Sequence, residues 1–433
     1  MSEFDIISFL QDRALKRLHK KEDLENFCNL AAKGLIPDYQ ISAWLMAAYL
    51  NPMSPKETVE LTLAMSQSGK TLDLTSLPQP SIDKHSTGGV GDKTTFVLLP
   101  LLAACDVTTV KMSGRGLGIT GGTLDKVASI PGFRTDLQIN EILRQAKEIG
   151  IVLTGQSESL APADKVFYSL RDATATVDSI TLIVSSILSK KIAGGAKNII
   201  LDVKCGSGGF MTSLDQARLL QDELKFVGSA CGLNITTHIS DMSQPLGEAI
   251  GNALEVEEAF RILQNLNLTS NSRRFRDFCI EIGTQALITC GKTTSIAQAK
   301  AMIENALDNE SAWSKAKDWM SAQGATQFAP FIEPLPFEDI CAYENGYLHQ
   351  IDAGAIGRAI IELGGGRMKK EASIDHSVGI IVHALIGDEV HVGQSLCTVF
   401  FREYSQFEVA KQMILSGIKI RREYCNPTPM LYE

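Results

Sequence analysis

The sequence predicts a multi-domain α/β protein with a helical domain, a mixed-sheet α/β domain and a small β-rich module at its carboxyl end. Three observations predict this fold class. Helical patterns fill the first 70 residues, strand-like runs then alternate with helical patterns, and short strands with glycine turns follow from about Pro336. With 433 residues, the chain is long enough for two or three domains and a large core.

The helical prediction for the amino-terminal region depends on its start and stop signals. Ser54-Pro-Lys-Glu57 is a capping box with proline at the first helical position, and Gly69 marks a helix end. A later stretch from Ser179 to Ile192 is rich in apolar residues and contains neither glycine nor proline, so it also predicts a helix. Ser186 and Lys190 are four residues apart and therefore share one face of that helix.

The α/β prediction depends on short runs of β-branched and other apolar residues. These runs are Thr95 to Leu99, Thr108 to Met112, Ile199 to Val203 and Ile235 to Ile239. The carboxyl-terminal module is predicted from the segments Gly379 to Gly387 and Val390 to Leu396. This module also resembles a biotinyl or lipoyl carrier domain, but Lys369 and Lys370 lie outside its turn pattern, which disfavours a carrier function.

The most informative segment is the glycine-rich run at residues 83–95, called here the first glycine turn. Its three glycines, Gly88, Gly89 and Gly91, allow backbone N–H groups to converge on an anion, and Lys84, Ser86 and Thr95 add a positive charge and two hydroxyl donors. His85 then lies beside the bound anion as a proton donor. Asp92 follows Gly91 where a Walker loop requires lysine, so the turn does not predict ATP chemistry.

A second glycine turn, at residues 113–126, follows the strand-like run that ends at Met112. It contains Gly116-x-Gly118-x-x-Gly121, with Asp136 downstream, and a nicotinamide-dependent dehydrogenase is therefore an alternative. A single match of this kind is weak evidence, and the segment is more polar than a helix-packing turn needs to be. Three of its polar residues are predicted to bind phosphate as well: Ser113, Arg115 and Thr123.

Composition and charge exclude several classes of protein. A net charge of −9 disfavours general nucleic-acid binding, and the nine cysteines include no C-x-x-C pair, which disfavours a zinc site and disulfides. We expect no bound metal. The sequence has no apolar stretch long enough to span a membrane, and Met1-Ser-Glu-Phe-Asp5 lacks the basic start of a signal peptide. These features predict a cytoplasmic enzyme.

The motifs together resemble those of the thymidine and pyrimidine-nucleoside phosphorylase family. The matching segments occur in the family's order along nearly the whole chain: Lys84 to Asp92, Ser113 to Gly118, Thr120 to Lys126, Ser159 to Lys165, Arg171 to Ser179 and Asp202 to Phe210. The resemblance implies a nucleoside phosphorylase or phosphoribosyltransferase-like fold. It also implies a homodimer formed through the helical domain.

The activity that the resemblance implies is reversible phosphorolysis of pyrimidine nucleosides in pyrimidine salvage. The enzyme would use inorganic phosphate as co-substrate and need no cofactor. It would convert thymidine, deoxyuridine or uridine to the free base and the (deoxy)ribose 1-phosphate. Residues implied to bind the base are His85, Arg171, Ser186 and Lys190, with pocket walls from Leu117, Tyr168 and Phe210. The predicted catalytic residues are His85, Arg171 and Lys190. Without the resemblance, the sequence favours a solvated, salt-bridged face for Arg171 and Lys190, and the resemblance reverses this preference.

The same resemblance predicts the domain boundaries. The expected domains are a helical, base-binding and dimerising domain (1–68 and 163–193), an α/β phosphate-binding domain (80–154 and 197–335) and a carboxyl-terminal β-rich module (336–433). Two alternatives to phosphorolysis stay open: a phosphoribosyltransferase of related fold, and a catalytically altered nucleoside-binding paralogue.

Three positions depart from the family pattern. Ile119 and Ala128 stand where the family usually has histidine and glutamate, and their joint change is expected to alter sugar or base preference rather than abolish activity. Lys93 stands where some members have a small hydroxyl residue near a monovalent cation, together with an acid that matches Glu258. The ammonium of Lys93 could then occupy the place of that ion.

Overall fold

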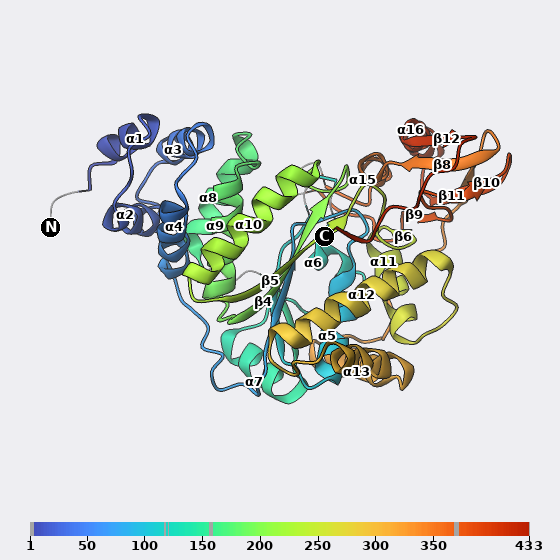
Figure 1. Cartoon of the computed structure of the whole chain (residues 1–433), viewed down its shortest axis with the longest axis horizontal. Helices are drawn as coiled ribbons and strands as arrows, with labels where there is room; N and C mark the ends of the chain where they lie inside the picture. Colours follow the sequence, from blue (N-terminus) through green and yellow to red (C-terminus); the bar gives the residue numbers. More distant parts are fainter. Residues whose placement is uncertain (1–3, 117, 120, 156–158, 368–371, 433) are drawn as a thin grey trace. The chain divides into compact units, whose positions relative to one another are not determined.

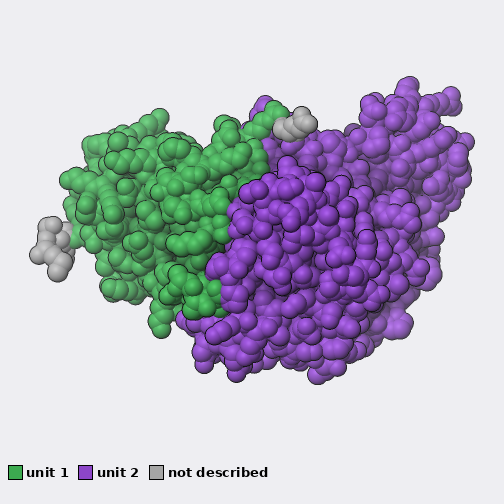
Figure 2. All heavy atoms as spheres, turned by 60° about the horizontal axis from the view of Figure 1, so that its bottom comes forward, with its two compact units in different colours: residues 1–77, 156–199, 218–237 green, residues 78–155, 200–217, 238–433 purple. Residues whose placement is uncertain are grey.

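The structure is a computed structural model that describes residues 4–116, 118–119, 121–155, 159–367 and 372–432. The chain divides into two compact units, which Figure 2 distinguishes by colour. Unit 1 comprises residues 1–77, 156–199 and 218–237, and unit 2 comprises residues 78–155, 200–217 and 238–433. Among the described residues, none of the helices is long and apolar enough to cross a membrane.

Unit 1 is mainly helical (Figure 1). Its helices are α1 (Ile6–Ala14), α2 (Lys21–Ala32), α3 (Asp38–Leu50), α4 (Pro55–Gln67), α8 (Pro162–Ala173), α9 (Ile180–Ala193) and most of α10 (Leu214–Ala230). The capping box predicted at Ser54 and Glu57 is confirmed at the start of α4. Helix α4 packs against α9 and α2. The stacked rings of Phe27 and Phe167 and the buried Trp44 join α2, α3 and α8 in one apolar core.

The sheets of the α/β part of unit 2 are short. One sheet has the order β1-β4-β5-β13, in which β13 runs antiparallel to β5, and β2 pairs with β3 in parallel. The strands are β1 (Asp83–Ser86), β2 (Thr109–Ser113), β3 (Ile151–Gly155), β4 (Asn198–Cys205), β5 (Asn234–Asp241) and β13 (Leu431–Tyr432). The first residues of β4 and β5 group with unit 1. The helices are α5 (Thr94–Ala104), α6 (Thr123–Val127), α7 (Ile139–Ile149), α11 (Asn252–Leu263), α12 (Ser270–Thr289), α13 (Ile296–Asp308) and α14 (Ser311–Ala322).

The carboxyl-terminal part of unit 2 has two small sheets and two helices. The sheet β6-β9-β11-β7 contains β6 (Ala249–Ile250), β7 (Phe337–Cys341), β9 (Gly379–Val382) and β11 (Ser395–Phe400); the other, β10-β8-β12, contains β8 (Gly346–Ile351), β10 (Glu389–Val390) and β12 (Ile418–Arg421). Helices α15 (Ala353–Glu362) and α16 (Tyr404–Ser416) pack against each other. Strand β6 precedes α11 in the chain and so belongs to the α/β part, but it pairs with β9 of the module. The module therefore shares a sheet with the α/β part.

The structure corrects one predicted element. Residues Thr95 to Leu99, predicted as a strand, belong to the buried helix α5. All but one of the helix residues are aliphatic, aromatic or threonine, and ten of the eleven are buried, so no amphipathic period marks the run as helical. The strand predictions at Thr108–Met112, Ile199–Val203 and Ile235–Ile239 are confirmed by β2, β4 and β5.

The mixed α/β fold class with a helical amino-terminal region and a small carboxyl-terminal module is confirmed. The three predicted domain boundaries stay predictions. The compact units differ from them most in that residues 218–237 group with the helical unit and the carboxyl-terminal module groups with the α/β part. The helical unit also extends to residues 69–77, 156–162 and 194–199.

Candidate active site

The first glycine turn connects β1 to α5 in unit 2. Gly88 and Gly91 have φ of +92° and +76°, a backbone conformation that favours glycine. A Cβ atom on Gly91 would lie 2.8 Å from the carbonyl oxygen of Leu246, so the turn also needs glycine for space. Since α5 begins at Thr94, the turn leads directly to the amino end of a helix, where the helix dipole favours an anion.

Asp92 is the residue of the first glycine turn that Lys84 and Ser86 both contact. Its carboxylate lies 3.6 Å from the Lys84 ammonium and accepts a 2.5 Å hydrogen bond from the Ser86 hydroxyl. Burial alone would raise the pKa of Asp92, but Lys84, Lys204, Lys126 and the Ser86 bond together hold it well below its usual value. Asp92 is therefore ionised and fixes two of the predicted phosphate-binding residues.

Two further buried lysines border this turn, and the sequence reasoning did not select them. Lys126 Nζ donates to the Asp92 carbonyl oxygen at 2.9 Å and pairs with Glu255 at 2.5 Å. Lys204 Nζ lies 2.6 Å from Asp202, and the backbone N–H of Lys204 donates to the Thr87 hydroxyl. The lysines thus tie the turn to α6, α11 and β4.

Two buried threonines, Thr94 and Thr95, lie at the start of α5. Thr95, the predicted phosphate donor, is buried. The hydroxyl oxygen of its neighbour Thr94 is also buried and has no hydrogen-bond partner among the described residues. A buried hydroxyl without a partner is unusual, so Thr94 is a second candidate donor that the sequence reasoning missed.

The second glycine turn places its predicted phosphate-binding residues in the same part of unit 2 as the first glycine turn. Ser113 is the last residue of β2, and Thr123 is the first residue of α6, which Lys126 links to the first turn. Arg115 is exposed in the turn between them. Leu117, a predicted wall of the base pocket, lies outside the described residues.

Lys190 is the centre of a polar cluster on α8 and α9 in unit 1, which we call the α8–α9 cluster. Its ammonium donates to Asp164 at 2.5 Å and to the Ser186 hydroxyl at 2.7 Å. Burial lowers the pKa of Lys190, and the Asp164 carboxylate opposes that shift. These bonds use neither the third N–H of the ammonium nor the Ser186 O–H, so both can donate to a ligand.

Arg171 and Tyr168 complete the α8–α9 cluster. The Arg171 guanidinium donates to the carbonyl oxygens of Thr176, Val177 and Leu182, in the α8–α9 connection and the start of α9. Since a guanidinium has five N–H donors, these bonds leave two for other partners. The ring of Tyr168 lies 6.0 Å from the Arg171 guanidinium carbon and 5.9 Å from Lys190 Nζ. The Arg171 guanidinium is thus buried and held by these bonds, and it is not part of a solvated face.

Asp164 is the member of this cluster that the sequence reasoning did not select. Its carboxylate is buried, and the oxygen that does not contact Lys190 has no hydrogen-bond partner among the described residues. Its position in the first turn of α8, two residues after Pro162, is a local signal for a helix start. Nothing local in the sequence indicated its pairing with Lys190, which is 26 residues away.

The two other predicted contacts, His85 and Phe210, belong to unit 2. His85 is half-buried on β1 beside Lys84. Phe210 is 40% exposed, in the loop that follows β4. The structure does not test what either side chain binds.

Lys93 is fully buried behind the first glycine turn. Its ammonium lies 2.6 Å from Glu258 and donates to the carbonyl oxygens of Leu246 and Ala249 at 2.6 and 2.9 Å. Glu258 also accepts hydrogen bonds from the backbone N–H groups of Glu248 and Ala249. The ammonium is therefore surrounded by oxygen atoms, as a bound alkali cation would be. Among the described residues, there is no group of three histidine, cysteine or acidic side chains that could hold a metal ion.

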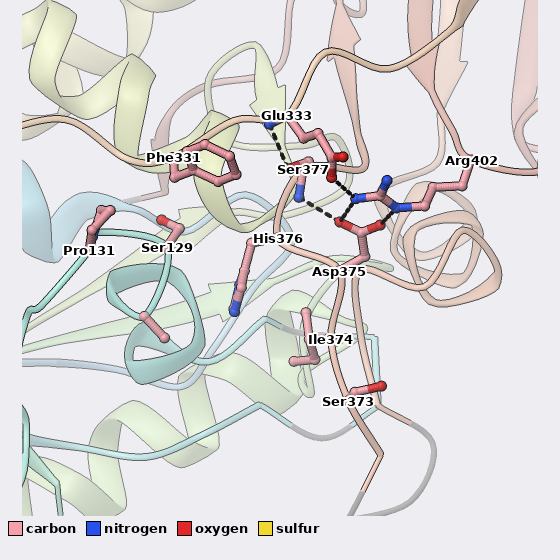
Figure 3. A pocket seen from close by; sticks show the side chains of 11 residues that line it. Ser129, Pro131, Phe331, Glu333, Ser373, Ile374, Asp375, His376, Ser377 and Arg402 are labelled. Carbon is pink, nitrogen blue, oxygen red and sulfur yellow. Dashed lines mark hydrogen bonds and ion pairs between the residues drawn. The ribbon is translucent and has the colours of Figure 1, made fainter.

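The two other departures from the family pattern lie in unit 2. Ile119 is in close contact with α15, because a Cβ on Gly357 would be 3.1 Å from the Ile119 Cβ. Ala128 lies at the edge of a cavity of about 580 Å³ whose lining includes Ser129, Phe331 and His376. Figure 3 shows this cavity, with Arg402 between the carboxylates of Glu333 and Asp375. The residues predicted for base and phosphate do not line it.

Family models match three parts of the chain. A glycosyl transferase family a/b domain matches residues 78–313, and the helical bundle domain of the same family matches residues 9–69. A pyrimidine nucleoside phosphorylase C-terminal domain matches residues 347–421. The fold and these matches thus define a glycosyl transferase family protein with a helical bundle and an α/β domain.

Relatives that match nearly the whole chain show which family within this class it belongs to. The chain is 42% identical over 418 residues to the pyrimidine-nucleoside phosphorylase of Geobacillus stearothermophilus, a match that covers 95% of both chains. It is also 42% identical over 407 residues to that of Bacillus subtilis strain 168, with 93% of each chain covered. The chain therefore belongs to the pyrimidine-nucleoside phosphorylase family.

A solved structure shares the fold at lower sequence similarity. The anthranilate phosphoribosyltransferase of Thermus thermophilus matches 72% of this chain and 98% of its own, with a TM-score of 0.58 and 15% identity. This likeness confirms the expected phosphoribosyltransferase-like architecture and supports no conclusion about activity.

Proposed function

We propose that the chain catalyses reversible phosphorolysis of pyrimidine nucleosides. A phosphate oxygen attacks C1′ of the sugar, the C1′–N1 bond breaks with its electron pair going to the base, and the anionic base then takes up a proton. The products are the free base and the (deoxy)ribose 1-phosphate. The observation that carries this proposal is the presence of both a glycine turn with buried lysines in unit 2 and the α8–α9 cluster in unit 1, in a chain of this family.

We assign the phosphate to the donors of the two glycine turns. These donors are the ammonium of Lys84, the hydroxyls of Ser86, Thr95, Ser113 and Thr123, and the guanidinium of Arg115. The assignment is supported by the amino end of α5 and by the buried lysines around the first turn. Ser86 donates to Asp92 in the free protein, so its hydrogen must turn from Asp92 to the phosphate on binding.

We assign the leaving base to the α8–α9 cluster and His85. Lys190, Ser186 and Arg171 offer N–H and O–H donors to the two carbonyl oxygens and the ring nitrogen of a pyrimidine. Negative charge grows on these atoms as the C1′–N1 bond breaks, so the donors stabilise the transition state more than the substrate. His85 acts as hydrogen-bond donor or general acid at the base O2, a role typically worth about 10²- to 10⁴-fold. Tyr168, Leu117 and Phe210 would cover the ring.

The first experiment measures release of free base from thymidine, deoxyuridine, uridine and cytidine, with and without phosphate. We expect release only with phosphate, and a loss of about a hundredfold or more in His85→Ala. Lys190→Met should lower kcat strongly, because it removes a charge that the departing base needs. Equal base release without phosphate, or full activity in both variants, would contradict the proposal.

The fold likeness to a phosphoribosyltransferase favours one competing function. Such an enzyme would need magnesium and a diphosphate leaving group. Incubating the chain with free uracil or thymine, phosphoribosyl diphosphate and magnesium tests this directly, and nucleotide formation faster than phosphorolysis would favour the alternative. A protein that binds nucleosides without turning them over would be inactive in both assays.

Three finer features belong to the same proposal. The only co-substrate is inorganic phosphate, without a cofactor, and the location is cytoplasmic. The protein forms a homodimer through its helical unit. Dimerisation is supported by exposed apolar side chains spaced along one side of α3, namely Tyr39, Met46 and Leu50. A molar mass from light scattering that equals one chain would contradict it.

A further inference from the structure

The second glycine turn is held by a buried ion pair whose partners are 242 residues apart in the chain. One carboxylate oxygen of Asp125 accepts the backbone N–H of Gly116 at 2.6 Å, and the other accepts Arg367 at 2.7 Å. The carbonyl oxygen of Arg367 in turn accepts the N–H of Gly118 at 3.3 Å. Asp125 and Arg367 therefore fix the turn backbone on both sides of residue 117.

Both side chains of this pair are buried, and both also bond to the backbone. The Asp125 side chain is 3% exposed and that of Arg367 is 8% exposed, so each charge depends on the other. Arg367 also donates from Nε to the Ala372 carbonyl oxygen at 2.9 Å. Removing one partner of such a pair leaves a buried charge without compensation. The carboxylate would then lose the orientation in which it receives Gly116.

Helix α15, which leads to Arg367, also lies against both glycine turns. A Cβ on Gly357 would lie 2.8 Å from the Ile119 carbonyl oxygen and 2.9 Å from a methyl group of Val90. Only glycine allows the helix backbone so close to the two turns. The carboxyl-terminal module thus supports the turns by packing as well as through the Arg367 side chain.

We propose that Arg367 is a positioning residue for phosphate, acting directly on the backbone of Gly118 and through Asp125 on that of Gly116, and thereby on Arg115 and Thr123. The proposal rests on the proposed function, because it assigns phosphate to these donors. Arg367 does not contact the substrate. Its guanidinium sets the geometry of a turn whose own sequence is too rich in glycine to hold one conformation.

The matched control is Arg402, a second ion-paired arginine of the carboxyl-terminal module. It binds Glu333 and Asp375 beside the cavity of Figure 3, and these two carboxylates belong to neither glycine turn. Its replacement should affect the module without affecting phosphate. A difference between the two arginines therefore separates positioning of the turn from general support of the fold.

The test compares Arg367→Met, Arg367→Lys and Asp125→Asn with Arg402→Met. We expect Arg367→Met to raise the KM for phosphate by about tenfold to a hundredfold, with the nucleoside KM little changed, since a buried charge loses its partner. Arg367→Lys should raise the phosphate KM less than Arg367→Met does. Lysine keeps the charge beside Asp125 but cannot also donate to the Ala372 carbonyl oxygen as the Arg367 Nε does. Arg367→Met combined with Asp125→Asn should be less harmful than the two effects added. Arg402→Met should keep the phosphate KM of the unaltered chain.

Amide hydrogen exchange gives a readout that does not depend on turnover. In the absence of ligands, Arg367→Met should exchange faster in peptides covering residues 113–122 and at an unchanged rate in residues 83–92. If the unaltered chain releases no base, the proposed function fails while this measurement still decides the positioning role. An unchanged phosphate KM, or unchanged exchange at residues 113–122 in a folded Arg367 variant, would overturn the inference.

Discussion

Lys93 occupies a site whose ligands are those of an alkali cation. Its ammonium is surrounded by Glu258 and two carbonyl oxygens, all within 2.9 Å, and it is fully buried. Since this charge is part of the chain, a free ion has no room to add. We therefore predict that phosphorolysis does not depend on potassium. Initial rates in potassium salts and in salts of a large organic cation should agree.

A strong requirement for potassium would contradict this prediction. The matched variant is Lys93→Met, which keeps the length of the side chain but removes its charge. It should destabilise the chain by about 3–5 kcal/mol, because Glu258 would remain as an unpaired buried charge. Denaturant unfolding of both proteins measures the difference.

His19 predicts a pH dependence for the stability of unit 1. Its Nε2 accepts a hydrogen bond from the Trp44 indole N–H at 3.0 Å, and its ring stacks on Phe9. Burial, with the nearby charge of Arg13, lowers the pKa of His19 to about 4, although Glu57, Asp12 and Asp23 act in the opposite direction. The unfolded chain thus binds a proton between about pH 6.5 and 4 that the folded chain does not, so stability falls as the pH is lowered.

The expected loss of unfolding free energy between pH 7 and 4.5 is about 2 kcal/mol. Other groups also titrate in this range, so the test is a comparison with His19→Gln, which can still accept from Trp44 but does not titrate. Urea unfolding monitored by tryptophan fluorescence should show a smaller pH effect in the variant. Identical pH profiles would show that His19 is protonated without cost.

At the scale of residues, the sequence predicts those functional groups that are close together in the chain. The spacing of Ser186 and Lys190 indicated a shared helix face, and their 2.7 Å contact confirms it. Asp164 and Arg367 were not selected, because their importance comes from pairing with residues 26 and 242 positions away. A single sequence contains no local signal for a contact across 242 positions.

At the scale of elements, the misassigned run at Thr95 to Leu99 has a simple cause. Helix α5 is buried on all sides, so its sequence has neither the period of an amphipathic helix nor the alternation of a half-buried strand. Pro100, which follows the run and lies inside α5, is also a residue that disfavours a helix interior. The error concealed a functional feature, because a helix at this position directs its amino end toward the first glycine turn.

The second glycine turn gives a matched pair of glycine substitutions. A Cβ on Gly122 would lie 2.0 Å from the Gly116 nitrogen and 2.4 Å from the Arg115 carbonyl carbon, whereas a Cβ on Gly114 would meet no atom within 4 Å. Gly122→Ala must therefore displace the backbone that carries Arg115, at a cost of about 1–3 kcal/mol. We expect a raised KM for phosphate in Gly122→Ala and a near-normal value in Gly114→Ala, measured by initial-rate kinetics. Equal values for the two variants would contradict this account.

At the scale of the whole molecule, the carboxyl-terminal module is part of the fold of unit 2. Val90, Met242 and Ile250 of the α/β part belong to the same buried apolar cluster as residues of the module. The change of sequence pattern near Pro336 indicates a new type of structure but does not show that its core is shared. Periodicity reveals which face of an element is apolar, and it does not reveal which other element covers that face.

A chain that ends at residue 335 should therefore fail to fold stably. Strand β6 would lose its partner β9, to which it pairs through Ala249–Ile381 and Ile250–Ile380. The side-chain amide of Asn271 would lose its bond to the Val382 carbonyl oxygen, and exposed strand edges favour aggregation. We expect this chain to be insoluble or to bind a hydrophobic dye, and co-expression with residues 336–433 to restore part of its solubility. A soluble truncated chain with a cooperative thermal transition near that of the full chain would show instead that the module folds as an independent domain.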